Sequence, residues 1–194
     1  MPFFQSRGLS FRRKRRKVTL TAAKSMALFI VEIIITLFIA FVIVYCAGMK
    51  VTVVGNSMEN TLKDGETVLV NRFTYNLTDP KAGDVIVFLP NGNEKSHYYV
   101  KRVVAVPGDT VQIRDGVLYV NGEMFDEEDT EAIKNPGVAE EEITVGEGEF
   151  FVLGDNRNSS EDSRYANIGN IKKEYIVGKA WFYIDSIRDM GRVR

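Results

Sequence analysis

The stretch "YYVKRVVAVPGDTVQIRDGVLYV", Tyr98 to Val120, decides the fold of the chain after its first fifty residues. It holds three short runs rich in Val, Ile and Tyr, which are separated by Pro107-Gly108 and by Asp115-Gly116. Asp-Gly between such runs is typical of a tight β-hairpin. The same pattern predicts strands at Val51–Val54, Thr67–Asn71, Asp84–Leu89, Tyr98–Val106, Thr110–Arg114, Val117–Val120, Phe150–Leu153 and Tyr175–Ile184.

The fold is therefore expected to be mainly β, with at most a helical turn within Ser163–Ile168. The segment 123–149 is acidic and poor in apolar residues, which is typical of a solvated loop or a small cap. We predict a core β domain formed by 50–106 and 150–189, with 107–149 inserted as a smaller β unit. The C-terminal tail, 190–194, is expected to be frayed.

A long apolar run precedes the β region. Ala27 to Ala47 reads "ALFIVEIIITLFIAFVIVYCA", 21 residues in which Glu32 is the only charge. A helix rises about 1.5 Å per residue, so this run spans a hydrocarbon core of roughly 30 Å. The apolar region of a cleavable signal peptide normally has only about 7–15 residues. We therefore expect a retained transmembrane anchor at 26–48.

Charge is unevenly distributed along the 194 residues. The net charge is −1, yet residues 1–24 carry eight basic side chains and no acidic one, which leaves 17 basic and 26 acidic side chains in the rest. By the positive-inside rule the basic segment 1–25 is expected to stay in the cytoplasm, with the β region on the other side of the membrane. Next to a span, such a segment is expected to contact anionic lipid rather than nucleic acid.

The chain has one cysteine, Cys46, and one histidine, His97. These counts exclude an intramolecular disulfide, Cys-rich zinc sites and metal sites built from several histidines. A Ser-His-Asp triad would depend on His97 alone.

The first candidate for chemistry is Ser57, in "VVGNSMENTLKDGETVLV", Val53 to Val70. Gly55 and Asn56 allow the backbone to approach Ser57 closely, which can turn N–H groups toward a developing oxyanion. A serine hydroxyl is a weak nucleophile and needs a base. Without one, a serine in a Gly/Asn turn has a structural role.

The second candidate is Lys101, within the predicted strand Tyr98–Val106. Alternation along a strand gives Lys101 the face of His97 and Tyr99, and gives Arg102 the opposite face. A lysine among Val, Tyr and Ala is desolvated, which lowers its pKa toward the range of about 7–8 that suits a general base. The alternative is a strand lysine whose ammonium group reaches solvent.

The third candidate is the polar loop "VLGDNRNSSEDSR", Val152 to Arg164. Asp155, Asp162, Arg157 and Arg164 can form fixed ion pairs that orient a buried lysine. The alternatives are a solvated loop or a calcium site. The spacing does not match an EF-hand loop, and the two arginines argue against a bound cation.

Taken together, these segments resemble a known family. "GNSMENTL", "KAGDVIVF", "YYVKRVVAVPGD" and "GDNRNSSEDSR" are similar, in order and spacing, to the successive sequence boxes of bacterial type I signal peptidases. The resemblance implies a signal-peptidase-like β ectodomain behind one N-terminal transmembrane helix. It implies a membrane-bound serine endopeptidase with Ser57 as the nucleophile and Lys101 as the general base.

The resemblance also assigns supporting residues. Ser160 matches the serine that hydrogen-bonds the lysine, and Met58 matches a residue that lines the binding pocket. Gly55 stands where some members carry a serine that donates to the oxyanion, and glycine there resembles members from Gram-positive bacteria. The residues that match those holding the site together are Asp155, Asp162 and Arg164.

The family cuts signal peptides after small residues, at Ala-x-Ala sites, on the outer face of the plasma membrane. The resemblance therefore implies preprotein signal peptides, the lipid bilayer and the general secretion translocon as partners, no nucleic acid, and no metal or other cofactor. Asn60 departs from the family, which usually has proline there. Losing proline frees a backbone N–H and loosens the turn.

Three alternatives stay open on the sequence alone. Asn60 is the one feature that supports a catalytically silent, membrane-anchored binding module. A Ser–Lys autoprotease attached to a DNA-binding domain is disfavoured by the apolar run that stands in place of such a domain. Eukaryotic and archaeal relatives use histidine as the base, but here His97 lies four residues before the base position.

Overall fold

The structure is a computed structural model that describes residues 20–47, 49–125, 131–186 and 189–193. The chain divides into two compact units, 1–41 and 42–194. Most of the predicted basic segment, 1–25, lies outside the described residues, and so does the side chain of Cys46.

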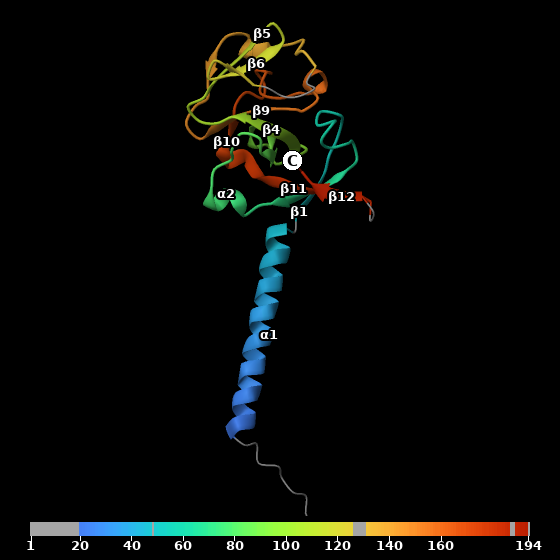
Figure 1. Cartoon of the computed structure of the whole chain (residues 1–194), viewed down its shortest axis with the longest axis vertical. Helices are drawn as coiled ribbons and strands as arrows, with labels where there is room; N and C mark the ends of the chain where they lie inside the picture. The colour runs from blue at the N-terminus through green and yellow to red at the C-terminus, as the bar shows by residue number, and fades with distance from the viewer. Residues whose placement is uncertain (1–19, 48, 126–130, 187–188, 194) are drawn as a thin grey trace, which may run out of the picture. The chain divides into compact units, whose positions relative to one another are not determined.

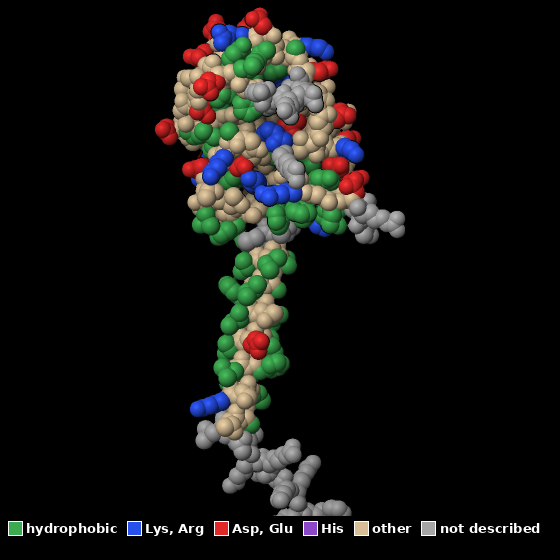
Figure 2. Space-filling model, viewed as in Figure 1, with side chains coloured by type: hydrophobic (Ala, Val, Ile, Leu, Met, Phe, Trp, Pro, Cys, Tyr) green, Lys and Arg blue, Asp and Glu red, His purple; other side chains and the backbone are tan. Residues whose placement is uncertain are grey.

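The apolar run forms a single long helix, α1, Leu20–Ala47. The helix begins before residue 26, the predicted start of the anchor, because "LTAAKS" continues the helical pattern toward the N-terminus. Apolar side chains stand exposed along it, as Figure 2 shows for one face. Its segment Thr21–Tyr45 is long and apolar enough to cross a membrane. A helix that is apolar all round is suited to lipid, because no polar face needs water.

Most of the strands after α1 form one antiparallel sheet. Its order is β1-β2-β11-β3-β4-β9-β10, and β12 pairs with β11. Figure 1 shows β9 next to β4, and β12 next to β11. The long strand β11 pairs with both β2 and β3 through register shifts that let it bend. The bounds are β1 Met49–Thr52, β2 Thr67–Asn71, β3 Val85–Phe88, β4 Tyr99–Ala105, β9 Glu149–Leu153, β10 Ile171–Lys172, β11 Ile176–Ser186 and β12 Asp189–Arg192.

A second antiparallel sheet has the order β7-β6-β5-β8. Asp115 and Gly116 join β5 to β6 with φ angles of 53° and 78°. Two positive φ angles are what the tight two-residue hairpin turn requires, and Asp-Gly suits it. The predicted hairpin is therefore confirmed, with Arg114 paired to Val117. The bounds are β5 Thr110–Arg114, β6 Val117–Val120, β7 Glu123–Met124 and β8 Ile143–Thr144.

Strand β4 lies at the centre of the apolar packing. Val100, Val103 and Val104 belong to three different buried clusters, one of which joins β4 and β9 to the smaller sheet. Figure 1 shows the smaller sheet beside β9 and β4. A polar side chain on β4 is therefore enclosed by packed neighbours and has little access to water.

Short helical segments connect the strands. α2 is Thr74–Leu77. The 3₁₀ turns among the described residues span Pro90–Gly92, Gly137–Glu140, Arg157–Ser159 and Lys173–Tyr175.

The mainly β fold is confirmed, and three predicted strands, β2, β5 and β6, have the predicted bounds. Ser163–Ile168 folds into consecutive turns, and the Gly169 N–H donates to the Tyr165 carbonyl four residues earlier, which agrees with the helical turn expected there. One expectation was wrong. The C-terminal segment expected to be frayed contains β12, and Val193 after it is buried. The division into 50–106 with 150–189 and an inserted 107–149 stays a prediction.

Candidate active site

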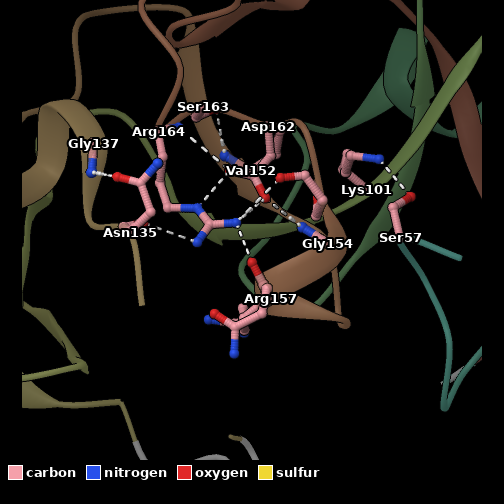
Figure 3. A network of polar contacts seen from close by, with 12 residues as sticks. Ser57, Lys101, Asn135, Gly137, Val152, Gly154, Arg157, Asp162, Ser163 and Arg164 are labelled. Atoms are coloured by element: carbon pink, nitrogen blue, oxygen red, sulfur yellow. Dashed lines mark hydrogen bonds and ion pairs between the residues drawn. The ribbon is translucent and has the colours of Figure 1, made fainter. Parts of the chain in front are cut away.

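A hydrogen bond joins two side chains that lie 44 residues apart in the sequence. Lys101 Nζ donates to Ser57 Oγ at 2.7 Å (Figure 3). Lys101 comes from the middle of β4, and Ser57 from the loop between β1 and β2. The serine and lysine predicted from sequence therefore face each other directly.

The Ser57 loop is held at both ends and in its middle. Backbone bonds between Val53 and Glu66 and between Gly65 and Val53 close it, and the Gly55 N–H donates to Asp64 at 2.7 Å. Met58, beside Ser57, is fully buried in the core. These contacts hold the loop against the core, so Ser57 has a defined position.

Lys101 is only 4% exposed. Burial lowers its pKa from 10.5 to about 8, and the carboxylates of Asp162, Glu161 and Asp155 oppose that shift. Burial has this effect because it disfavours the charged ammonium group. The desolvation expected for this lysine is thus found, and a useful fraction of the neutral amine exists near neutral pH.

A buried ion pair supports the polar loop. Asp162 Oδ1 accepts from Arg164 Nε at 2.8 Å, and Asp162 Oδ2 accepts from Arg164 Nη2 at 2.9 Å. Asp162 Oδ2 also accepts from the Gly154 N–H at 3.2 Å. Arg164 extends to the carbonyls of Arg157 and Asn135 (Figure 3). Through these hydrogen bonds the ion pair holds the backbone at Gly154, Arg157 and Asn135.

Asp155 anchors the other side of the loop. Arg102 donates to both of its carboxylate oxygens at 2.7 Å, and the Thr61 hydroxyl donates to Oδ2 at 2.5 Å. This bidentate pair links β4, the Ser57 loop and the polar loop. Sequence reasoning had not included Arg102 or Thr61 in the site. Arg102 could have been found from the alternation of side chains along β4, because this alternation turns Arg102 away from Lys101 and toward the loop that carries Asp155.

Ser160 differs from the expectation. Its Oγ is buried, and among the described residues it has no hydrogen-bond partner, so the bond to Lys101 that the resemblance implied is not formed. Gly154 lies against it, and a Cβ atom at position 154 would overlap both Ser160 Oγ and the Ser57 carbonyl oxygen. Glycine is therefore needed at position 154 for this close approach. The sequence analysis did not assign this role to Gly154, although it quoted the loop that contains it.

A groove of about 310 Å³ opens at Ser57 and Lys101. One wall is the segment Val53–Ser57, the other is His97–Lys101, and Ser159 and Glu161 complete the lining.

Met58 is not among the residues that line the groove. His97 lies in the wall, but it is Lys101 that contacts the Ser57 hydroxyl. Within the described residues, the Ser57 backbone N–H makes no hydrogen bond, so it is available beside its own hydroxyl.

Comparison with known proteins identifies the chain's family. A family model described as "Signal peptidase, peptidase S26" matches residues 26–184. The chain belongs to this family. As a signal peptidase it is a serine peptidase, and it cleaves signal peptides from preproteins.

Individual relatives agree with this assignment. The chain is 39% identical over 173 residues to "Signal peptidase IB" of Staphylococcus aureus (strain COL), which covers 79% of the chain and 88% of the relative. It is 36% identical over 167 residues to "Signal peptidase I P" of Bacillus subtilis subsp. natto, covering 80% and 89%. A solved signal peptidase I from Enterococcus faecalis V583 is 32% identical, covers 53% of this chain and 97% of its own, and has a TM-score of 0.42.

Asn60 of this signal peptidase has a backbone that proline cannot adopt. Its φ is 85°, and the turn is closed by the Thr61 N–H, which donates to the Met58 carbonyl at 3.0 Å. The loosened turn expected from the loss of proline is not what the structure contains. Asparagine tolerates the left-handed region, so the turn is well formed with a different backbone path.

Proposed function

We propose that this signal peptidase is a membrane-bound serine endopeptidase that cuts after small residues, at Ala-x-Ala sites, through a Ser57–Lys101 dyad. The observation that carries the proposal is the 2.7 Å hydrogen bond between the Ser57 hydroxyl and a lysine that is buried and has a lowered pKa. A serine is a useful nucleophile only beside a base, and Lys101 is that base.

The reaction follows from the protonation state of Lys101. The neutral amine takes the Ser57 proton as Oγ attacks the scissile carbonyl carbon. The tetrahedral oxyanion is stabilised by backbone N–H groups, including that of Ser57, since Gly55 has no side chain to donate. The ammonium group then protonates the leaving amine, and the ester remains on Ser57. Water, deprotonated by Lys101, attacks the ester carbonyl carbon. The bond to Ser57 Oγ then breaks, the Lys101 ammonium returns its proton to Oγ, and the new carboxyl group is released.

The supporting residues act by holding Ser57 and Lys101 in place. Asp162 with Arg164, and Asp155 with Arg102, tie the polar loop to its surroundings. The Asn156 N–H donates to the Ser57 carbonyl at 3.1 Å, so that loop also fixes the nucleophile. The unpaired Ser160 hydroxyl is kept next to the site as an acceptor for the Lys101 ammonium when the proton has moved.

Substrate binds in the groove as an extended strand. Its two walls, 53–57 and 97–101, offer backbone groups for pairing, and main-chain bonds of this kind give affinity without side-chain specificity. Small residues are selected because the space beside Ser57 is confined to a groove of about 310 Å³. Met58 contributes to the selection of small residues indirectly, because its buried side chain supports the Ser57 loop.

The helix α1 anchors the enzyme in the plasma membrane in a single pass. The basic N-terminal segment stays in the cytoplasm, and the catalytic region, with 107–149 inserted into the β core, lies outside it. Anchoring confines enzyme and preprotein to one layer and raises their effective concentration. The partners are the lipid bilayer and the general secretion translocon that delivers the substrate.

The test is cleavage of an Ala-x-Ala peptide by the full chain in detergent. Wild type is compared with Ser57→Ala and Lys101→Ala, and with the nearby controls Ser96→Ala and Lys95→Ala, whose residues do not line the groove. We expect wild type and both controls to cut after the second alanine, and both dyad variants to be inactive. Cleavage by Ser57→Ala at the wild-type rate would exclude the dyad. Binding of the peptide without cleavage by wild type would indicate a binding module.

A further inference from the structure

Glu161 lies in the groove but has no part in the mechanism above. Among the described residues that line the groove, it carries the single carboxylate. Its neighbour Asp162 is fully buried in the ion pair with Arg164, whereas Glu161 is exposed on the groove side of the same loop. The loop thus turns the Asp162 side chain into the protein interior and the Glu161 side chain toward the groove.

The Glu161 carboxylate is held in a fixed orientation. The Tyr99 hydroxyl donates to Oε2 at 3.1 Å, and Asn167 Nδ2 donates to Oε1 at 3.3 Å. Asn167 is itself braced by Asn91, whose Nδ2 donates to the Asn167 carbonyl at 2.9 Å. A carboxylate has about four acceptor positions, so two remain for a further donor.

The carboxylate is also connected to the reacting groups. The Tyr99 ring that donates to Glu161 lies with its centroid 5.4 Å from Lys101 Nζ. Burial, and then the hydrogen bond to Glu161, raise the pKa of Tyr99, so the phenol remains a donor and Glu161 remains the acceptor. Glu161 therefore lines the same groove as Ser57 and Lys101 and is linked to them through Tyr99.

The charge of Glu161 is not balanced within the groove when the enzyme is ready to react. The titratable side chains in the lining are Lys101, His97, Tyr98, Tyr99 and Glu161, and Glu161 is the one carboxylate among them. Lys101 must be neutral to act as a base, so the reactive form presents the negative charge of Glu161 to the bound peptide. Such a wall attracts a basic side chain and repels an acidic one.

We propose that Glu161 is a specificity-determining residue, which favours signal peptides carrying Lys or Arg close to the cleavage site over those carrying Asp or Glu. The proposal rests on the proposed function, since it assumes that substrate occupies this groove. Exposed ion pairs have modest energies, so the preference is expected to be about two- to fivefold for one charge.

The experiment is a charge scan of an Ala-x-Ala peptide. Lys, Gln or Glu is placed in turn at each position near the cleavage site other than the two alanines, and kcat/KM is measured for the full chain in detergent at low salt. Enzymes are wild type, Glu161→Gln, Glu161→Lys and the control Glu94→Gln, whose residue does not line the groove. The quantity compared is the Lys-to-Glu peptide ratio. Any change in the pKa of Lys101 affects both peptides equally and cancels.

We expect wild type and Glu94→Gln to prefer the Lys peptide at one or more positions, Glu161→Gln to bring the ratio close to one, and Glu161→Lys to invert it. The same ratio for wild type and Glu161→Gln at every position would overturn the proposal. The Gln peptide keeps the two proposals apart. If wild type does not cut it, the proposed function fails; if it is cut but the charge ratios do not change, only the role of Glu161 fails.

Discussion

The carboxylate of Asp162 accepts a hydrogen bond from the backbone N–H of Gly154, and so joins the buried ion pair to the segment that contacts the Ser57 loop. Gly154 packs directly against the Ser57 carbonyl, and the next residue but one, Asn156, donates to that carbonyl at 3.1 Å. The position of Ser57 is therefore set by a chain of contacts that starts at an ion pair with no access to water.

Asp162→Asn is expected to destabilise the fold severely. Asp162 is 0% exposed and Arg164 3%, so the amide would leave a buried guanidinium without its counter-charge. Breaking a buried pair in this way costs about 3–5 kcal/mol. The measurement is thermal unfolding of the full chain in detergent. The control is Asp79→Asn, which breaks the exposed pair with Lys173 and should cost no more than about 1 kcal/mol. Equal losses for both variants would contradict the structural role of Asp162.

Gly154→Ala is expected to reduce kcat strongly with a smaller effect on KM. The added methyl group would overlap Ser160 Oγ and the Ser57 carbonyl oxygen, so the loop must shift and Ser57 must move relative to Lys101. A displacement of about 1 Å at a reacting group can cost on the order of 100-fold in rate. The control is Gly146→Ala, whose methyl group would meet only the flexible end of the Glu149 side chain. An unchanged kcat for Gly154→Ala would show that the contact is not tight.

The activity is expected to rise with pH through a midpoint near 8. In the proposed mechanism Lys101 acts only as the neutral amine, and burial lowers its pKa to about 8 from its ordinary value of 10.5. Activity is therefore low below that pH, where the ammonium form dominates, and reaches its plateau above it. The measurement is the pH profile of kcat/KM. Lys101→Arg should be inactive throughout, because the guanidinium group stays charged. A midpoint close to 10.5 would mean that Lys101 is solvated in the working enzyme.

Local patterns predicted much of this fold. The strands β2, β5 and β6 have the bounds expected from runs of β-forming residues between turn signals, and Asp115-Gly116 specified its hairpin. The two-residue strands β7, β8 and β10 are too short to have a period of their own. β12 forms because β11 offers it an edge, and that depends on tertiary pairing.

The residues of the candidate site also divide into those that local patterns predicted and those that depend on tertiary contacts. Ser57 and Lys101 were suggested by local composition and by a family resemblance, and they do contact each other. Arg102 and Thr61 were missed because their partners lie more than forty residues away in the sequence. Gly154 was missed because its role depends on a close approach to the distant Ser57 as well as to the nearby Ser160. The resemblance also implied a bond from Ser160 to Lys101 that this arrangement does not contain.

Asn60→Pro is expected to impair the enzyme, although it restores the residue usual in the family. The φ of Asn60 is 85°, and the proline ring fixes φ near −65°, so the turn from Met58 to Thr61 would have to change its path. Thr61 would then lose its 2.5 Å hydrogen bond to Asp155, one of the contacts that join the Ser57 loop to the rest of the site. We expect kcat/KM to fall by about tenfold or more, because proline at an incompatible φ destabilises the native backbone.

Asn60→Gly is the matched control, because glycine adopts a positive φ without strain and should leave kcat/KM within about twofold of wild type. Within the described residues, the Asn60 N–H makes no hydrogen bond, so the loss of a donor cannot explain a defect in the proline variant. The comparison therefore isolates the backbone angle. A proline variant more active than wild type would mean that the working enzyme uses a negative φ at this position, and that Asn60 weakens a turn that proline would fix.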